Sequence, residues 1–155
     1  MSVDPGTQIV DAVEHCLEIA QTWLGWDGRP HVCEGGERIY TPHKAVRRIA
    51  DHLVDHLAEA ESLLAGEPPL ADGWHGSLVT LDSDWARFTE ADLVEAGQRL
   101  RRLARTYGLR LRTAGPAEWD APRGDNWTLR AAATHVCGVT WYAEQVGRLA
   151  GSGAR

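Results

Sequence analysis

Long apolar runs are absent from this chain of 155 residues. Because a helix needs about twenty apolar residues to cross the hydrocarbon core of a bilayer, no membrane-spanning segment is predicted. The first residues, Met1 to Gly6, also lack the basic start and the apolar stretch of a secretory signal. Together these absences predict a cytoplasmic protein that has no membrane partner.

Cysteine is scarce, and its three residues, Cys16, Cys33 and Cys137, are widely and irregularly spaced. An odd number without a closely spaced pair is atypical of a disulfide framework or a thiolate zinc site, so we expect reduced thiols. Positive charge is also in deficit, since 16 Lys and Arg against 22 Asp and Glu give a net charge of −6. This balance disfavours binding to nucleic acid or to an anionic membrane.

Phenylalanine and tyrosine are rare, with 1 Phe and 3 Tyr against 7 Trp. A tryptophan usually needs both an apolar wall and a hydrogen-bond partner for its ring N–H. Most of the tryptophans fall near predicted helix ends or in links, where we expect them to close the ends of a helical bundle: Trp23, Trp26, Trp74, Trp85, Trp119 and Trp127. Trp141 alone falls in the middle of a predicted helix.

Apolar residues at the spacing of amphipathic helices are abundant, and no segment of comparable length alternates with the period of a strand. The predicted helices cover residues 7–26, 41–66, 89–111 and 128–146. Thr41 followed by Pro42, and Thr89 followed three residues later by Asp92, are typical of helix starts. Thr128 is the predicted start of the fourth helix.

The predicted fold is all-α, a four-helix bundle, because each helix has one apolar stripe that it cannot bury alone. The link at 66–88 is clearly longer than the other two, which predicts a long crossover that lets the second and third helices lie parallel. Trp74, His75 and Trp85 on this link are expected to fold over one end of the bundle. Residues 1–150 are predicted to form a single domain, followed by a disordered tail at 151–155.

The most suggestive polar residues are two histidines on the second predicted helix. His52 and His56 are four residues apart and share a helix face, so both can bind one transition-metal ion. His135 flanks the apolar stripe of the fourth helix and can complete a set that suits zinc, nickel or iron(II). Asp51 or Asp55 can orient an imidazole. The alternative is a solvated pair, because one turn of rotation in this helix would move His52 and His56 from the cavity to solvent.

The third predicted helix ends in a strongly basic cluster, whereas the segment before Gly28 has only acidic charges. One interpretation is that the basic helix lies near the acidic first helix, and the other is an anion site for a substrate phosphate or carboxylate. We expect the first, because several of these arginines spiral around the helix instead of converging. The basic residues are Arg99, Arg101, Arg102, Arg105, Arg110 and Arg112.

The fourth predicted helix contains a short local motif. Trp127 is followed by Thr128, Leu129 and Arg130, His135 comes eight residues after the tryptophan, and the aromatic residues Trp141 and Tyr142 follow. This pattern resembles the fourth helix of the DinB-like superfamily, in which W-[ST]-x-R precedes a histidine at that distance. The layout of four helices with a long crossover and a histidine-bearing second helix is similar as well.

The resemblance implies a divalent metal held by one histidine of the second helix and two of the fourth, and several family members are thiol-dependent transferases or isomerases. His135 matches the first ligand on the fourth helix, and His52 or His56 matches the ligand on the second. Val139 stands four residues after His135 and Ala131 four before it, so the second ligand on the fourth helix is missing. Either His52, His56 and His135 form a two-plus-one set, or the metal site has been lost.

Three functions therefore remain open from the sequence. The first is a metal-dependent enzyme of the DinB-like kind that binds zinc or nickel, acts on a small-molecule substrate, and lines its substrate site with Trp141 and Tyr142. The second is a metal-free bundle that binds a small apolar or aromatic molecule, and the third is a structural homodimer. The distances among the side-chain nitrogens of the three histidines distinguish the first function from the other two, because nitrogens more than about 6 Å apart cannot share one zinc ion.

Overall fold

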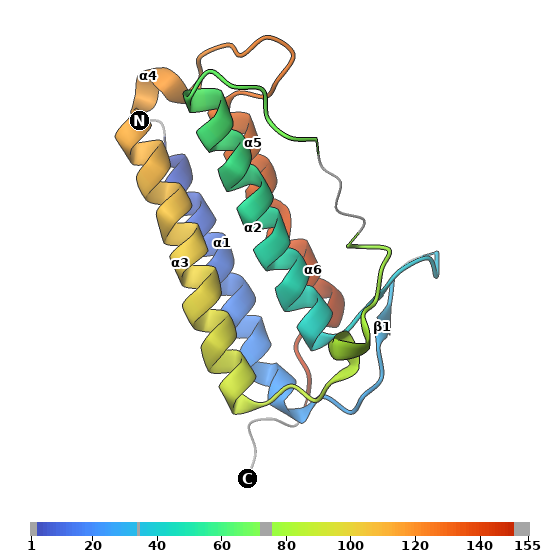
Figure 1. The fold of residues 1–155 in the computed structure, drawn as a ribbon. Coiled ribbons are helices and arrows are strands. Elements are labelled where there is room, and N and C mark those ends of the chain that lie inside the picture. The colour runs from blue at the N-terminus through green and yellow to red at the C-terminus, as the bar shows by residue number, and fades with distance from the viewer. Residues whose placement is uncertain (1–2, 34, 72–75, 151–155) are drawn as a thin grey trace.

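The computed structural model describes residues 3–33, 35–71 and 76–150, and this part of the chain is mostly helical (Figure 1). Its α-helices are α1 (Pro5–Ala20), α2 (Pro42–Leu64), α3 (Glu90–Ala114), α4 (Pro116–Trp119), α5 (Leu129–Val136) and α6 (Thr140–Val146). Shorter 3₁₀ helices are η1 (Gln21–Gly25), η2 (Asp82–Trp85) and η3 (Cys137–Val139). Two short strands, β1 (His31–Val32) and β2 (Ile39–Tyr40), pair antiparallel, with His31 opposite Tyr40.

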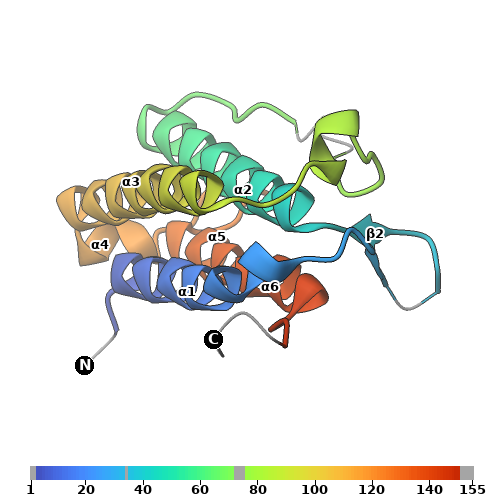
Figure 2. The same cartoon turned by 90° about the horizontal axis from the view of Figure 1, so that it is seen from below.

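The long helices α1, α2 and α3 lie side by side with the segment formed by α5, η3 and α6 (Figures 1 and 2). Helices α2 and α3 run in the same direction along the molecule, and the other two segments run in the opposite direction. The connection from α2 to α3 returns to the end of the molecule where α2 begins. Helix α2 packs against α3, α5 and α6, which places its inner face opposite the fourth predicted helix.

Three of the four predicted helix starts are confirmed, whereas the first helix begins at Pro5, two residues before its predicted start. Three threonine side chains cap the helices by accepting a hydrogen bond from a backbone N–H in the first turn, as expected for an N-cap. The pairs are Thr41 with Lys44 in α2, Thr89 with Asp92 in α3, and Thr128 with Ala131 in α5. Pro42 occupies the first turn of α2, where its missing N–H has no cost.

The first and fourth helices were each predicted as one continuous helix, and this is wrong in both cases. The first α-helix ends at Ala20 and continues only as η1 to Gly25, instead of reaching residue 26 as one helix. The fourth is not continuous, because η3 interrupts it around Gly138, a residue type that weakens helices. The strands and α4 were not predicted, since elements of two and four residues are too short to show a period.

The apolar stripes of the helices meet in one buried cluster, which includes Ile49, Leu53, Leu100 and Val136. Of the six tryptophans predicted to close its ends, Trp23 and Trp119 are buried there, whereas Trp127 is 47% exposed. Trp23 is fully buried and donates its ring N–H to the carbonyl of Gly147 at 2.8 Å. Trp119 donates to the carbonyl of Leu111 at 2.7 Å.

The remaining predictions concern the long link, the tail, the cysteines and membrane spans. Trp85 is 44% exposed, so it does not pack as a buried cap. Trp74, His75 and the tail at 151–155 lie outside the described residues. The described cysteines are all free thiols, as expected. None of the described helices combines the length and the apolar character needed to cross a membrane.

Ion pairs connect the basic third helix to the acidic first helix, as expected. Arg101 of α3 lies 2.7 Å from the Glu14 carboxylate of α1, and Arg112 lies 3.5 Å from Asp4. The two helices are in close backbone contact at Gly6 and Gly108, since a Cβ built on Gly6 would lie 2.6 Å from the Gly108 Cα. The arginines of α3 therefore serve in part to hold two neighbouring helices together.

Candidate metal centre

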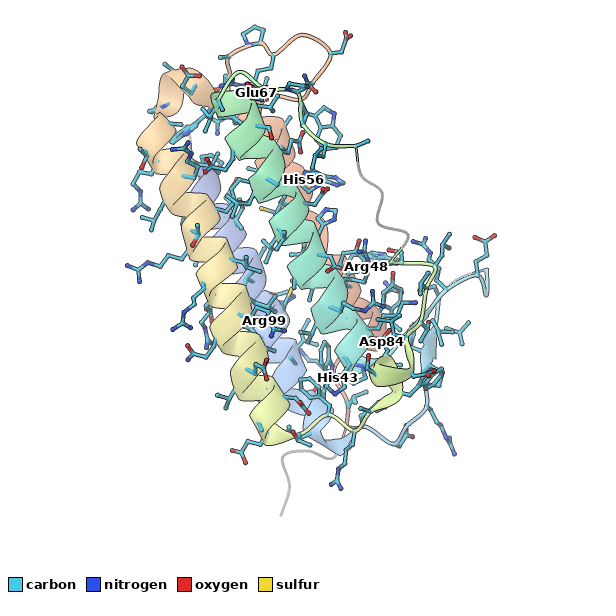
Figure 3. All side chains as sticks on the ribbon, in the orientation of Figure 1. His43, Arg48, His56, Glu67, Asp84 and Arg99 are labelled. Atoms are coloured by element: carbon cyan, nitrogen blue, oxygen red, sulfur yellow. The ribbon has the colours of Figure 1, made fainter. Side chains whose placement is uncertain are left out.

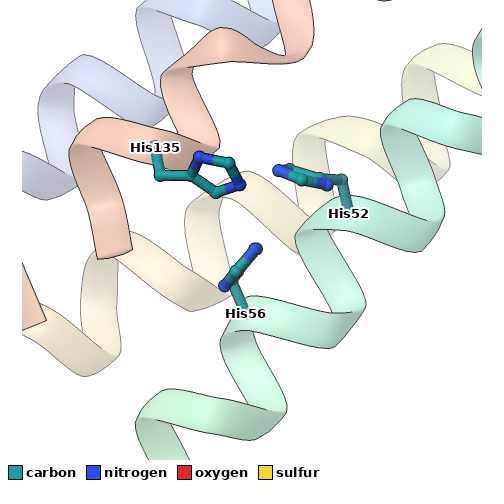
Figure 4. A group of neighbouring side chains, drawn as sticks. All are labelled: His52, His56 and His135. Carbon is teal, nitrogen blue, oxygen red and sulfur yellow. The ribbon is translucent and has the colours of Figure 1, made fainter. Parts of the chain in front are cut away.

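Three histidine side chains converge between α2 and α5 (Figure 4). His52 and His56 lie one turn apart on α2, and His135 reaches toward them from the last turn of α5. One nitrogen atom from each ring lies within 4.8 Å of the other two. The rotation of α2 that would have turned the histidine pair to solvent does not occur, because Leu53 and Ile49 of the same helix are buried in the core.

The donor set fits a metal ion of the zinc type. Two nitrogens bound to one zinc ion in tetrahedral geometry at 2.0–2.1 Å lie about 3.4 Å apart. The separation of up to 4.8 Å in the histidine cluster therefore closes with a shift of about 1.4 Å, which rotations of the side chains provide. Three imidazole ligands leave a fourth position for water or substrate, as in catalytic zinc sites.

A carboxylate orients one of the three rings. The Glu59 Oε2 atom lies 2.6 Å from Nδ1 of His56, whose side chain is buried except for 11% of its surface. When Nδ1 carries the proton and donates it to the carboxylate, Nε2 presents a lone pair to an ion. The sequence predicted that Asp51 or Asp55 would have this role. Instead Asp51 pairs with Arg48 at 3.1 Å, and Asp55 lies 4.0 Å from Nε2 of His56.

Electrostatics favour the neutral form of the third ring. Partial burial and the neighbouring His56 lower the pKa of His135 below its ordinary value, and the more distant Glu59 offsets this only in part. A histidine must be neutral to bind a metal ion, so His135 needs little or no deprotonation near pH 7. The exposed position of His135 leaves the cluster accessible from solvent.

Aromatic rings flank the histidine cluster on two sides. The Trp127 ring, which lies just before α5, is 4.9 Å from the His135 ring and 6.3 Å from the His56 ring between centroids. On the other side the Tyr142 ring of α6 is 6.0 Å from the His52 ring. Of the two residues predicted to bind substrate, Tyr142 thus contacts the cluster directly. Trp141 packs against Tyr40 and Tyr142, one ring further away.

A pocket of about 310 Å³ opens beside the cluster. His56 and Trp127 form one wall of it, and Leu70 from the α2–α3 connection and Asp125 also line it. A small molecule in this pocket would lie against both the imidazole and the indole ring. The pocket is large enough for a small ligand next to His56.

Two residues of the site, Glu59 and Trp127, were not singled out as partners of the histidines. A signal existed for Glu59, since it follows His56 by three residues and side chains at that spacing meet on a helix. Trp127 precedes the cap of α5, where the sequence does not fix the direction of its ring. In comparisons with protein-family models, curated proteins and solved structures, nothing matched this chain.

Proposed function

We propose that this chain is a four-helix bundle of the DinB-like kind that binds one divalent metal ion, zinc or nickel, through His52, His56 and His135. The convergence of these three side chains within 4.8 Å is the observation that carries the proposal. In this proposal the connection between α2 and α3 is the long crossover of the bundle. The absent second histidine of the fourth helix is replaced by the second histidine of α2.

The proposed activity is a metal-dependent reaction of a small molecule, of the thiol-dependent transferase or isomerase type. A bound zinc ion would lower the pKa of a thiol or water at its open position and so supply a nucleophile at neutral pH. Glu59 contacts the His56 ring at its Nδ1 atom, and the rings of Trp127 and Tyr142 lie beside the histidine rings. The 310 Å³ pocket beside His56 is the proposed place for the rest of the substrate.

Metal analysis of protein purified without a polyhistidine tag tests the proposal. About one equivalent of zinc or nickel is expected after dialysis against the metal, and the variant with alanine at His52, His56 and His135 is expected to retain none. The matched control is His15→Ala, because His15 lies on α1 and pairs with Glu144 at 3.6 Å, away from the cluster. Equal metal content in the parent and the triple variant would refute the metal centre.

The 310 Å³ pocket favours a second candidate function, a bundle that binds a small apolar or aromatic molecule without a metal. Trp127 is 47% exposed and forms part of this pocket, so its indole face is available to a ligand. In this case a chelator leaves ligand binding unchanged, and Trp127→Ala abolishes it. A screen of aromatic acids, thiols and lipids by tryptophan fluorescence, with and without chelator, distinguishes the two functions.

A further inference from the structure

A second polar cluster lies one helical turn from the histidines, on the side of α2 toward its start. Arg48 precedes His52 by four residues, so both project from the same side of α2. Figure 3 shows Arg48 between α2 and the connection that returns from its far end. The guanidinium donates from Nε to the Ser77 hydroxyl at 3.2 Å, and Nη2 lies 3.5 Å from the Tyr142 hydroxyl. Tyr142 thus contacts both the guanidinium and the His52 ring.

Among the residues that the structure describes, one hydroxyl of this second cluster is buried without a hydrogen bond of ordinary geometry. Tyr40 of β2 is fully buried, and its ring lies 5.9 Å from the Tyr142 ring. Its hydroxyl is near Ser77 but makes no hydrogen bond of ordinary geometry with any residue that the structure describes. A buried hydroxyl left in this way costs about 1–3 kcal/mol, which a bound acceptor would recover. The donor is therefore free for a ligand.

The charge around the second cluster is positive. Lys44 is 1% exposed, and its Nζ donates to the Thr80 hydroxyl at 3.0 Å. Among the described residues no carboxylate lies within salt-bridge distance of it, and burial lowers the pKa of its ammonium group. Of the neighbouring carboxylates, Asp51 pairs with Arg48 itself at 3.1 Å and Asp84 pairs with Arg47 at 2.7 Å. The three cations Lys44, Arg47 and Arg48 therefore exceed these two carboxylates by one charge. A buried cation without a counter-ion attracts an anion.

The backbone of Gly76 lies close to the guanidinium of Arg48. A Cβ built on Gly76 would lie 2.6 Å from Nη1 of Arg48, so any side chain at this position would displace the guanidinium. The half-buried side chains Ser77 and Tyr142 separate the guanidinium from solvent.

We propose that Arg48, Tyr40, Ser77 and Tyr142 form a subsite for the carboxylate of a substrate whose other end reaches the histidine centre. Lys44 contributes the unbalanced positive charge, Arg48 offers its Nη2 while Nη1 stays paired with Asp51, and the three hydroxyls supply hydrogen-bond donors to the carboxylate oxygens. The subsite rests on the proposed function for the position of the substrate's reactive end. The assigned substrates are short anionic molecules. Their carboxylate and their metal-binding atom are separated by about 5 Å, the rise of one helical turn between Arg48 and His52.

A charge series of thiols tests this assignment in the protein loaded with cobalt(II). Mercaptopropionate, mercaptopropanol and aminopropanethiol share a three-carbon chain and differ in the charge of the terminal group. Thiolate binding to the ion is followed by its charge-transfer absorbance. Mercaptopropionate is expected to bind at least roughly tenfold more tightly than the other two, the effect of one hydrogen bond to a charged group. Equal affinity for the three thiols would overturn the subsite while leaving the metal centre intact.

Tyr40→Phe is the decisive variant, because it removes only a hydroxyl that makes no hydrogen bond of ordinary geometry with the described residues. Its stability is expected to equal or exceed that of the parent, and its preference for mercaptopropionate is expected to fall roughly tenfold. Tyr107→Phe is the matched control, since Tyr107 is also fully buried with an unpaired hydroxyl but lies on α3. An unchanged preference in Tyr40→Phe, or the same loss in both variants, contradicts the proposal.

A metal-free measurement separates the subsite from the metal centre. Phosphate at constant ionic strength is expected to raise the melting temperature of the metal-free parent and of Tyr107→Phe more than that of Tyr40→Phe. If cobalt(II) does not bind at all, the metal centre is refuted and this comparison alone judges the subsite. Equal phosphate effects on all three proteins would then exclude it.

Discussion

Glu59 and His56 lie three residues apart on α2, and Oε2 of the carboxylate is 2.6 Å from Nδ1 of the imidazole. This contact fixes the His56 ring so that its other nitrogen faces His52 and His135. A carboxylate behind a ligating histidine both orients the ring and raises its basicity. The pair links the stability of α2 to the geometry of the candidate metal centre.

Replacement of Glu59 is expected to weaken metal binding without removing a ligand. Glu59→Ala should lower zinc affinity roughly 10- to 100-fold, because the His56 ring loses the partner that orients it. Competition with a chromophoric chelator measures the affinity. Glu61→Ala is the control on the same helix, since Glu61 pairs with Arg110 of α3 and not with a histidine. A similar loss in both variants would show that the effect is not specific to the His56 contact.

Zinc is expected to stabilise the folded protein. Because the three histidines converge only in the fold, an ion at one hundred times its dissociation constant adds about 2.7 kcal/mol to the free energy of unfolding. For a chain of this length that corresponds to roughly 5 to 10 °C in melting temperature. Calorimetry with zinc and with excess chelator measures the difference. His135→Ala should melt at the same temperature in both conditions, and a zinc effect that persists there argues for another site.

The fold is expected to lose stability in alkali through one buried thiol. Burial raises the pKa of Cys16 to about 12, whereas an unfolded cysteine titrates near 8.5. Since the folded state holds the proton more tightly, this contribution is complete below the unfolded pKa and is lost as the pH rises toward the folded value. At pH 10 the loss is about 2 kcal/mol. Urea unfolding at pH 8 and pH 10 should show a smaller difference for Cys16→Ala, and an identical difference would contradict this linkage.

Two glycine substitutions are expected to have opposite effects. Gly6→Ala places a Cβ 2.6 Å from the Gly108 Cα, so α1 and α3 must separate, and the free energy of unfolding should fall by about 1–3 kcal/mol. Gly138→Ala meets no atom within 4 Å and should be neutral or stabilising by up to about 1 kcal/mol. Chemical denaturation of both variants measures the effects. A stable Gly6→Ala would mean that the two helices are not in close contact.

Local signals in the sequence were sufficient for the helix starts. Thr41, Thr89 and Thr128 cap their helices through contacts with residues only three positions away, and such contacts depend on sequence spacing alone. The unwinding at Cys137–Val139 was not predicted, because Gly138 alone lowers helix stability without fixing where the helix turns become tighter. The direction of Tyr142 toward α2 depends on the position of α6 beyond that interruption.

The sequence by itself determined that His52 and His56 share a face of one helix, because four residues make slightly more than one helical turn. Only the tertiary structure decided that this face meets His135, since the rotation of α2 about its axis is set by burial of Ile49 and Leu53 against distant residues. The tertiary structure likewise brought the Trp127 ring against the His135 ring. It also placed Tyr40 beside Tyr142, whose hydroxyl contacts Arg48. These contacts join residues from different elements, whose relative positions follow from packing of the whole core.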